Sequence, residues 1–367
     1  LRPGDPAIRA NLGTTLQMAW RHDRAAEELD RAVAASAPGL GRPGHPGHAA
    51  FRANRLLAAH YHPDVTLEDL DRLHRAWDAA VAGPVRRLPE ARRSHAVEPE
   101  PDRPLRVGFV SPDLGVHPVG IFLVGLLEHL PPGLDATCYA LRAVDDPVAR
   151  RLRDAAGSWI DARALDERAL AARIRADRID VLVDLAGHTQ ANRIRTFALR
   201  PAPVQATWMG YVGTTGLAEM DLLVADPHQL RPEDEAGVRE RVVRLPHDYV
   251  LFDPPEGAPE PGPLPAAARG HVTFGSFNNP AKLNEPLLAT WARVLQAVPG
   301  ARLRLRYQGF GDAALQARVR EALRRGGVEP ERVELGGRIP RTELLAAWTD
   351  VDLALDPHPY SGGLTTL

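Results

Sequence analysis

Short apolar segments alternate with helical patterns over two stretches of this 367-residue chain, and this alternation constrains the fold more than any other feature. The first stretch opens with the apolar segment 105–110 and the second with 272–276. Apolar strands that alternate with helices form a mostly parallel sheet with helices on both faces. We therefore predict two Rossmann-like doubly wound α/β domains, joined by a linker rich in Pro, Gly and Ala at residues 254–270.

The individual elements can be placed from the same pattern. Strands are expected at 105–110, 136–141, 181–185, 204–209 and 222–226 in the first domain (104–253), and at 272–276, 302–307, 333–335 and 353–355 in the second (271–367). Helices are expected at 164–178, 286–296, 313–325 and 342–348. Two doubly wound halves place a ligand cleft at the carboxyl ends of their strands.

Residues 1–83 are expected to form helical hairpins, followed by a polar linker at 84–103. Small and apolar residues fall at the spacing of a tetratricopeptide repeat, namely Leu12, Gly13, Leu16, Ala25, Leu29, Ala32 and Pro38. One such repeat cannot bury its own faces, so we expect further repeats before Leu1. The alternative is an ordinary helical cap on the next domain.

Composition narrows the class of protein. A formal net charge of −2 gives no indication of a nucleic-acid partner or an anionic membrane surface, and no apolar run reaches transmembrane length. The single cysteine, Cys138, excludes a disulfide framework and a cysteine metal site, which favours a reducing, cytoplasmic location. The chain begins at Leu1 without a methionine and stops at Leu367 in a Gly/Thr-rich segment that should open a helix. We interpret it as a fragment truncated at both ends.

Three loops that follow predicted strands of the first domain carry polar side chains or glycines. His117 lies in the loop after the first strand, where an imidazole suits proton transfer near neutral pH. His188 and Thr189 follow the third strand, and a loop with three glycines spans 209–216. Glycines allow close approach of the backbone to a ligand. The alternatives are a capping histidine and tight turns without a ligand.

Lys282 is the only lysine among 45 basic residues, and it lies just after the first strand of the second domain. A lysine is a compact ammonium that reaches one phosphate oxygen in a tight pocket, where the broad guanidinium of arginine does not fit. The segment 361–366, rich in Gly and Thr, is expected to present backbone amides at a helix N-terminus. These two features together predict a diphosphate site without a metal, since no carboxylate pair has an obvious Mg²⁺ spacing.

At these loops the chain resembles the protein O-linked N-acetylglucosamine transferases and the SPINDLY-type protein O-fucosyltransferases, a family that joins tetratricopeptide repeats to a two-domain GT-B glycosyltransferase. The resemblance covers nearly the whole chain. It is carried by residues 106–113 with His117 and Pro118, and by 197–205, 208–216, 277–282 and 362–366. It implies an inverting transfer from a nucleotide sugar, most simply UDP-N-acetylglucosamine, to Ser or Thr hydroxyls of protein acceptors presented by the repeats.

The same resemblance implies a role for individual residues. His117 would be a candidate base, and Lys282 would contact the departing diphosphate. The nucleotide sugar would be bound by Asn279, Lys282, Arg341, Gly363, Thr365 and Thr366. The sugar and acceptor pocket would be lined by His188, Thr189, Met209 and Gly210. No cofactor or metal is implied.

The chain also departs from the family pattern. Leu364 and Leu344 stand where the animal transferases have histidines that contact the nucleotide, and the acidic residue expected after the two threonines is absent. We therefore do not expect the fragment itself to be catalytically active. The alternatives are a protein O-fucosyltransferase using GDP-fucose, a scaffold of repeats with an inactive transferase, and a GT-B enzyme with another acceptor. A dinucleotide oxidoreductase is disfavoured, since the loop after Val110 lacks the G-x-G-x-x-G pattern.

Overall fold

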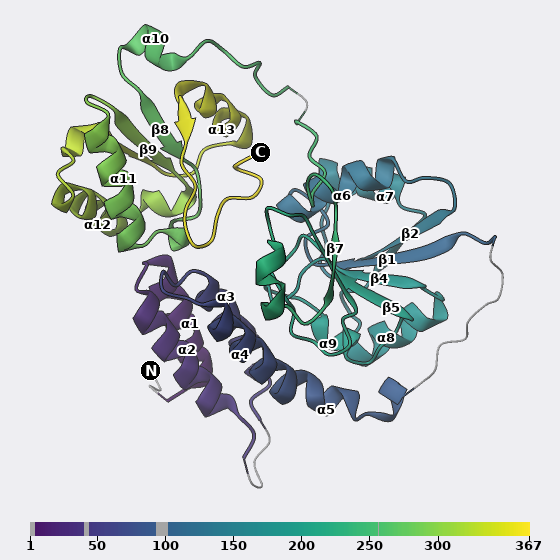
Figure 1. The fold of residues 1–367 in the computed structure, drawn as a ribbon. Coiled ribbons are helices and arrows are strands. Elements are labelled where there is room, and N and C mark those ends of the chain that lie inside the picture. Colours follow the sequence, from purple (N-terminus) through teal and green to yellow (C-terminus); the bar gives the residue numbers. More distant parts are fainter. Residues whose placement is uncertain (1–3, 40–43, 93–101, 256) are drawn as a thin grey trace. The chain divides into compact units, whose positions relative to one another are not determined.

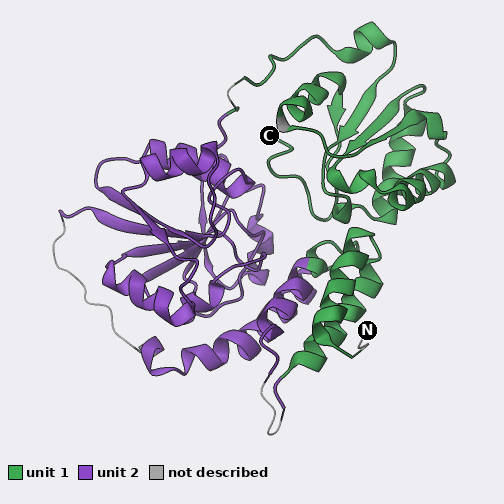
Figure 2. Cartoon of the chain, turned by 180° about the vertical axis from the view of Figure 1, so that it is seen from behind, with its two compact units in different colours: residues 1–37, 58–65, 254–367 green, residues 38–57, 66–253 purple. Residues whose placement is uncertain are grey.

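The computed structural model describes residues 4–39, 44–92, 102–255 and 257–367. The chain divides into two compact units (Figure 2). Unit 1 comprises residues 1–37, 58–65 and 254–367, and unit 2 comprises residues 38–57 and 66–253. The helical segment is thus divided between the two units, and the domain boundaries expected from the sequence remain a prediction.

The amino-terminal segment is helical, as expected. Its elements are α1 (Pro6–Met18), α2 (His22–Ser36), α3 (His48–His60), α4 (Leu67–Trp77), the π-helix η1 (Asp78–Ala82), α5 (Gly83–Arg86) and the 3-10 helix η2 (Pro89–Arg92). Thr66 and Asp69 form a capping box at the start of α4. The helices therefore continue into the range 84–103 expected to be a linker, of which residues 93–101 lie outside the described part of the chain.

Gly13 shows why α1 and α2 pack closely. A Cβ atom at Gly13 would lie 2.6 Å from Leu29 Cγ, so only a glycine allows this approach without displacing Leu29. Leu29 itself is fully buried. This is the contact of small and apolar residues that the repeat-like spacing predicted.

Unit 2 contains a seven-stranded parallel sheet with the order β3-β2-β1-β4-β5-β6-β7. Its strands are β1 (Leu105–Ser111), β2 (Leu134–Ala140), β3 (Ser158–Asp161), β4 (Val181–Asp184), β5 (Val204–Thr207), β6 (Leu222–Ala225) and β7 (Arg241–Arg244). Its helices are α6 (Pro118–Glu128), α7 (Pro147–Ala155), α8 (Glu167–Ala176), α9 (Ile194–Phe197) and the 3-10 helix η3 (Pro232–Gly237). The five predicted strands are present, whereas the two edge strands β3 and β7 were not predicted.

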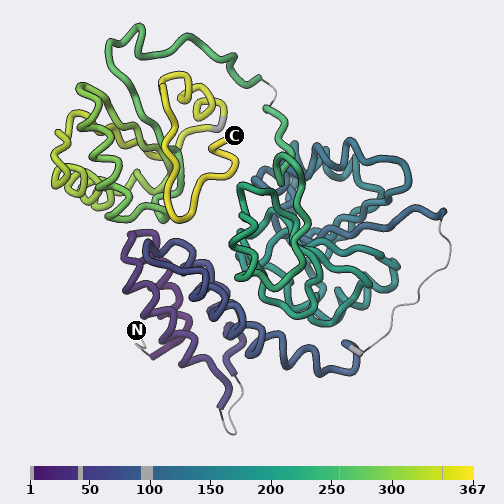
Figure 3. The backbone as a smooth tube through the Cα atoms, in the orientation of Figure 1, coloured from purple at the N-terminus to yellow at the C-terminus, as the bar shows by residue number. Residues whose placement is uncertain are grey.

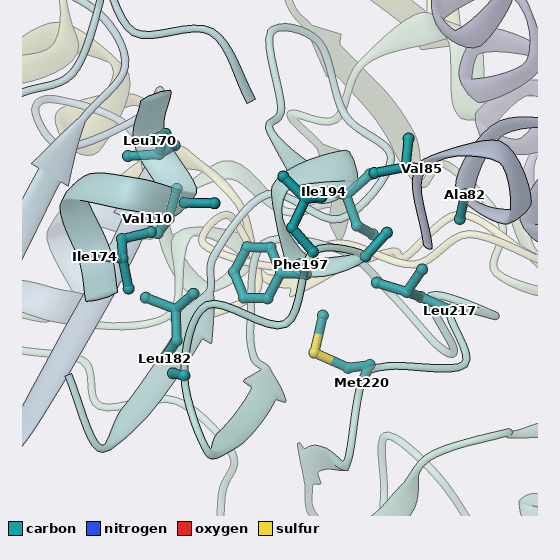
Figure 4. Packing of buried hydrophobic residues seen from close by; sticks show 14 of the residues in the cluster. Ala82, Val85, Val110, Leu170, Ile174, Leu182, Ile194, Phe197, Leu217 and Met220 are labelled. Carbon is teal, nitrogen blue, oxygen red and sulfur yellow. The ribbon is translucent and has the colours of Figure 1, made fainter. Parts of the chain in front are cut away.

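Helices cover both faces of this sheet, α6 and α7 on one and α8 and α9 on the other (Figure 1). Successive strand residues point to opposite faces, so Leu182 joins the core on the α8 face and Val183 the core on the α6 face. Figure 4 shows part of the core on the α8 face, including Leu182 and Phe197. Trp77 and Val85 of the helical segment also belong to it.

Unit 1 contains a four-stranded parallel sheet with the order β10-β9-β8-β11. Its strands are β8 (Thr273–Ser276), β9 (Arg302–Arg306), β10 (Val333–Gly336) and β11 (Leu353–Ala354). Its helices are α10 (Pro265–Arg269), η4 (Pro280–Lys282), α11 (Glu285–Ala297), η5 (Gln308–Gly311), α12 (Ala313–Arg325), η6 (Pro330–Arg332), α13 (Arg341–Ala347) and η7 (Trp348–Asp350), those labelled η being 3-10 helices. All four strands and three helices predicted here are confirmed.

Two further features of unit 1 concern its core and its carboxyl-terminal segment. Trp20, in the turn between α1 and α2, is buried in the core formed by α11 and α12. The guanidinium carbon Cζ of Arg318 lies 4.2 Å from the centroid of the Trp20 ring. The Gly/Thr-rich segment, which can be followed in yellow in Figure 3, ends in a turn closed by Thr366 N–H donating to Gly363 O. Residues 361–367 themselves form no helix, and the expectation that this segment opens one stays a prediction.

Candidate functional site

Lys282 lies in a polar cluster at the carboxyl ends of β8 and β11. Its Nζ donates to Ser361 O at 2.7 Å and to Asn278 Oδ1 at 3.4 Å. Thr365 Oγ1 donates to the same Asn278 oxygen at 3.2 Å. Because β8 and β11 pair in parallel, the loops that follow them lie at one edge of the sheet. The structure thus brings Lys282 and Thr365 together, while their role toward a ligand stays a prediction.

The Lys282 ammonium is partly desolvated. Burial lowers its pKa to about 8, and the nearby carboxylate of Asp356 opposes this shift. The ammonium also lies over the ring of Tyr360, 4.9 Å from the centroid. An amine with a pKa near 8 is about nine-tenths protonated at pH 7. Because a bound diphosphate would favour the charged form, the site is suited to an anion.

A further hydrogen bond holds the two loops together. The buried side chain of Asn284, which caps α11, donates from Nδ2 to His358 O at 2.7 Å. Asn279 caps η4 instead, since its Oδ1 accepts from Ala281 N at 3.0 Å. The side chain of Asn278, rather than that of Asn279, therefore contacts the Lys282 ammonium. The sequence analysis did not predict Asn284 or Tyr360 as site residues. The one sequence signal for them is that each follows a predicted strand of the second domain.

Thr366, Gly363 and Arg341 are the other residues of unit 1 that were predicted to bind the nucleotide. Thr366 Oγ1 donates to Asp356 Oδ1 at 3.0 Å, so this hydroxyl is held by a carboxylate. A Cβ at Gly363 would meet no atom within 4 Å, which leaves open space beside the backbone there. Arg341 is the first residue of α13, and its side chain lies outside the described part of the structure.

His117 is the N-cap of α6 in unit 2. Its Nδ1 accepts from Val119 N at 3.3 Å and lies 3.9 Å from Asp113 Oδ2, and its side chain is 47% exposed. Burial lowers the pKa of His117, an effect that Asp113 opposes and Arg142 reinforces. A neutral imidazole that accepts at Nδ1 carries its proton on Nε2. In this arrangement His117 therefore presents a donor to solvent, and acting as a base requires its ring to turn.

His188 lies inside unit 2, where its side chain is 1% exposed, and its role in a sugar pocket stays a prediction. Its Nε2 is 2.8 Å from Thr215 O, and its ring packs edge-on against Trp77 with the centroids 4.6 Å apart. The neighbouring Thr189 is half-buried, and its Oγ1 donates to Ala186 O at 2.8 Å. The reason for this burial is the helical segment, whose Trp77 occupies the space beside the ring.

Met209 and Gly210 follow β5, and both are half-buried. A Cβ at Gly210 would lie 1.8 Å from Leu185 O, so the loops after β4 and β5 touch through their backbones. Met209 has a positive φ of 39°, which is a strained conformation for a side chain of this size. Strain of this kind is often found at functional loops.

Asp184, at the end of β4, is buried under the same loops. It accepts from Gly187 N at 2.7 Å and from Thr207 Oγ1 at 3.3 Å. Burial raises its pKa to about 6, although these hydrogen bonds favour the carboxylate. Asp184 therefore organises the loop that carries His188 and Thr189.

A cavity of about 670 Å³ in unit 1 lies away from Lys282. It is lined by the first residues of β8, β9 and β10 and by several arginines, including Arg302 and Arg320. Strand beginnings and strand ends lie at opposite edges of a parallel sheet, so this cavity and the Lys282 cluster are separate features. Among the described residues no cluster of three or more His, Cys, Asp or Glu side chains could hold a metal ion. No helix in the described ranges is both long and apolar enough to cross a bilayer.

Each unit thus carries a parallel sheet wrapped by helices, with candidate residues in loops at the strand ends, and these features define the GT-B fold class. A solved structure of a mutant of the O-GlcNAc transferase of Thermobaculum terrenum is similar to this chain, with a TM-score of 0.89 and 35% sequence identity. The match covers 99% of this chain and 67% of the chain in that structure. The model of glycosyl transferase family 41 matches residues 87–255. The chain belongs to this family.

Plant proteins are similar over most of the chain. The probable UDP-N-acetylglucosamine–peptide N-acetylglucosaminyltransferase SPINDLY of Solanum lycopersicum is 37% identical over 325 residues, which are 85% of this chain and 34% of that protein. The probable UDP-N-acetylglucosamine–peptide N-acetylglucosaminyltransferase SEC of Arabidopsis thaliana is 31% identical over 274 residues, 71% of this chain and 27% of that protein. The chain thus spans about a third of the length of the first plant relative and about a quarter of the second.

Proposed function

We propose that the protein containing this chain transfers N-acetylglucosamine from UDP-N-acetylglucosamine to Ser or Thr hydroxyls of proteins, with inversion and without a metal. The names of the SPINDLY, SEC and Thermobaculum terrenum relatives support this donor and a peptide or protein acceptor. The observation that carries the proposal is the Lys282 cluster at the ends of β8 and β11.

The cluster suits the departure of a nucleoside diphosphate. As the bond from the sugar C1 to the phosphate oxygen breaks, negative charge grows on the diphosphate. An ammonium fixed at that oxygen stabilises the transition state more than the ground state. Lys282 is held there by Ser361 O and Asn278 Oδ1, and Thr365 supplies a hydroxyl beside it. These bonds orient the ammonium before an anion arrives, so little reorganisation is needed.

Unit 2 would serve the sugar and the acceptor. His117 caps α6 with its Nε2 turned away from the cap, so the neutral ring offers a donor to a sugar or phosphate oxygen. After rotation of the ring, the same group would accept the proton of the attacking hydroxyl. The helical segment, which we interpret as repeats of the tetratricopeptide kind, would present the polypeptide acceptor.

The experiment that tests the proposal is calorimetric binding of UDP and of GDP to the 367-residue chain and to the full-length protein. We expect UDP to bind and Lys282→Ala to weaken that binding. In full-length protein we expect Lys282→Ala to lower turnover by roughly 10²–10³, the usual scale for losing one donor at a developing anion. Lys282→Arg should also be impaired, because the guanidinium is broader than the ammonium.

Arg293→Ala is the matched control, since it removes an exposed cation from α11 of the same unit. It should leave UDP affinity and turnover unchanged. Normal turnover in full-length Lys282→Ala would remove Lys282 from the mechanism. Binding of GDP in preference to UDP would replace the donor by a GDP-sugar. No binding of either nucleotide to the full-length protein would sink the proposal.

A further inference from the structure

The helical segment reaches the Lys282 cluster within unit 1. Tyr61 follows the last residue of α3, and its ring centroid lies 4.8 Å from that of Tyr360. His60, which ends α3, also packs edge-on with Tyr360, and the two ring centroids lie 6.2 Å apart. Tyr360 in turn lies under the Lys282 ammonium, 4.9 Å away. The path from α3 to the ammonium therefore consists of two aromatic rings.

A second contact from the helices ends one residue from the lysine. The imidazole of His22, at the start of α2, is buried, and its Nε2 lies 2.9 Å from Leu283 O. A carbonyl only accepts, so His22 Nε2–H is the donor. The backbone after Lys282 is thus tied to α2 while the ring under Lys282 is packed against the end of α3. Both contacts join segments more than 200 residues apart in the sequence.

From these contacts we propose that Tyr61 is a positioning residue for Lys282: its ring holds Tyr360 in place beneath the ammonium and shields that ammonium from water. The inference rests on the proposed function in that the shielded ammonium is the one assigned to the diphosphate. It assigns to the helical segment a part in binding the donor, in addition to the part proposed for it in binding the acceptor.

The charges and rings around the ammonium agree with this assignment. Burial is the largest cause of the lowered pKa of Lys282, and the charge of Asp356 opposes it. Tyr61 is half-buried, and desolvation raises its pKa to about 12, so its ring stays neutral at physiological pH. With its ring neutral, Tyr61 can reduce the hydration of the Lys282 site without adding charge. Removal of the Tyr61 ring should admit water and return the pKa toward its ordinary value.

The single lysine makes this directly measurable. In the 367-residue chain labelled with ¹³C at lysine Cε, one resonance reports Lys282 and can be titrated between pH 6 and pH 11 without any nucleotide. We expect a midpoint near 8 in the wild type. Tyr61→Leu should move it upward by about one unit, since most of the shift comes from desolvation. Tyr61→Phe keeps the ring and should behave as the wild type.

UDP binding at pH 7 gives a second readout. Tyr61→Leu should weaken it by roughly threefold, the scale of one exposed cation–aromatic contact, and Tyr61→Phe should not. A wild-type midpoint near the ordinary lysine value, or an unchanged midpoint in a folded Tyr61→Leu, overturns the inference. Should Tyr61→Leu fail to fold, Tyr61→Met removes the same ring, leaves Tyr360 in place, and should give the same rise. If the midpoints move as stated but the wild type does not bind UDP, the proposed function fails and the positioning of Lys282 by Tyr61 stands.

Discussion

Replacing His74 should change how the stability of unit 2 depends on pH. This histidine of α4 is 1% exposed, with Nδ1 2.6 Å from Leu70 O and Nε2 3.0 Å from the Tyr211 hydroxyl. Since Leu70 O can only accept, the neutral ring carries its proton on Nδ1 and accepts at Nε2 from Tyr211. Burial lowers the pKa of His74 to about 4. The folded state therefore binds a proton less readily than the unfolded state.

The sign and size of the effect follow from linkage. Between pH 6.5 and pH 4 the unfolded chain takes up a proton that the folded chain does not, so stability is fully present above 6.5 and is lost as the pH falls. The loss amounts to about 3 kcal/mol, from 1.36 kcal/mol for each unit of pKa difference. Asp184 acts in the opposite direction, because burial raises its pKa to about 6 and stability is lost as the pH rises from 3.8 to 6. The two effects nearly cancel in the wild type.

Single variants should separate them. In His74→Gln, we expect the stability of unit 2 to fall by about 3 kcal/mol between pH 4 and pH 6, and in Asp184→Asn to rise by a similar amount. Hydrogen exchange of the β4 and β5 amides reports unit 2 by itself and is the measurement of choice. His247→Gln, at an exposed position, is the control and should follow the wild type. A His74→Gln profile parallel to that of the wild type would refute the reasoning.

Three further predictions concern packing and catalysis. Gly210→Ala should destabilise unit 2 by about 3 kcal/mol or more, because the added Cβ would overlap Leu185 O. Gly237→Ala, whose Cβ would have its nearest contact at 3.6 Å, should cost under about 1 kcal/mol. Urea unfolding distinguishes the two variants, and equal unfolding midpoints would contradict the packing argument. Trp20→Ala should lower the thermal stability of unit 1 by about 3 kcal/mol, measured by calorimetry, and an unchanged melting temperature would mean that the ring contributes nothing to that core. His117→Asn keeps an N-cap and should lower turnover of the full-length protein by roughly 10²-fold or more with UDP affinity unchanged, as expected for a proton-transfer group; a large loss of UDP affinity with an intact chemical step would instead make it a donor-binding residue.

Much of the fold could be predicted because buried parallel strands are short and almost wholly apolar. The segments at β1 and β4 are mostly of this kind, and each lies within one residue of its predicted bounds. The edge strands β3 and β7 were missed for the same physical reason. Ser158–Asp161 and Arg241–Arg244 are flanked by polar residues that face solvent, so neither forms an apolar run.

The candidate site was predictable only where it depends on the ends of neighbouring strands. Lys282 and Thr365 meet because β8 and β11 pair, and the alternation of strands and helices implies such a meeting. The burial of His188 could not be foreseen, since Trp77 comes from a helix more than 100 residues earlier. The contact of Tyr61 with Tyr360 likewise depends on how a helix packs on a distant loop, and no local pattern encodes it.

The helices contribute to the cores of both sheets, and this limits how the chain can be dissected. Trp20 is part of the core of unit 1, while Trp77 and Val85 are part of the core of unit 2. Cutting the chain at the end of the helices would expose both cores at once and would leave two aggregation-prone sheet fragments. For recombinant work the shortest sensible unit therefore retains the helices, and recombination between relatives should exchange the helices and the sheets together.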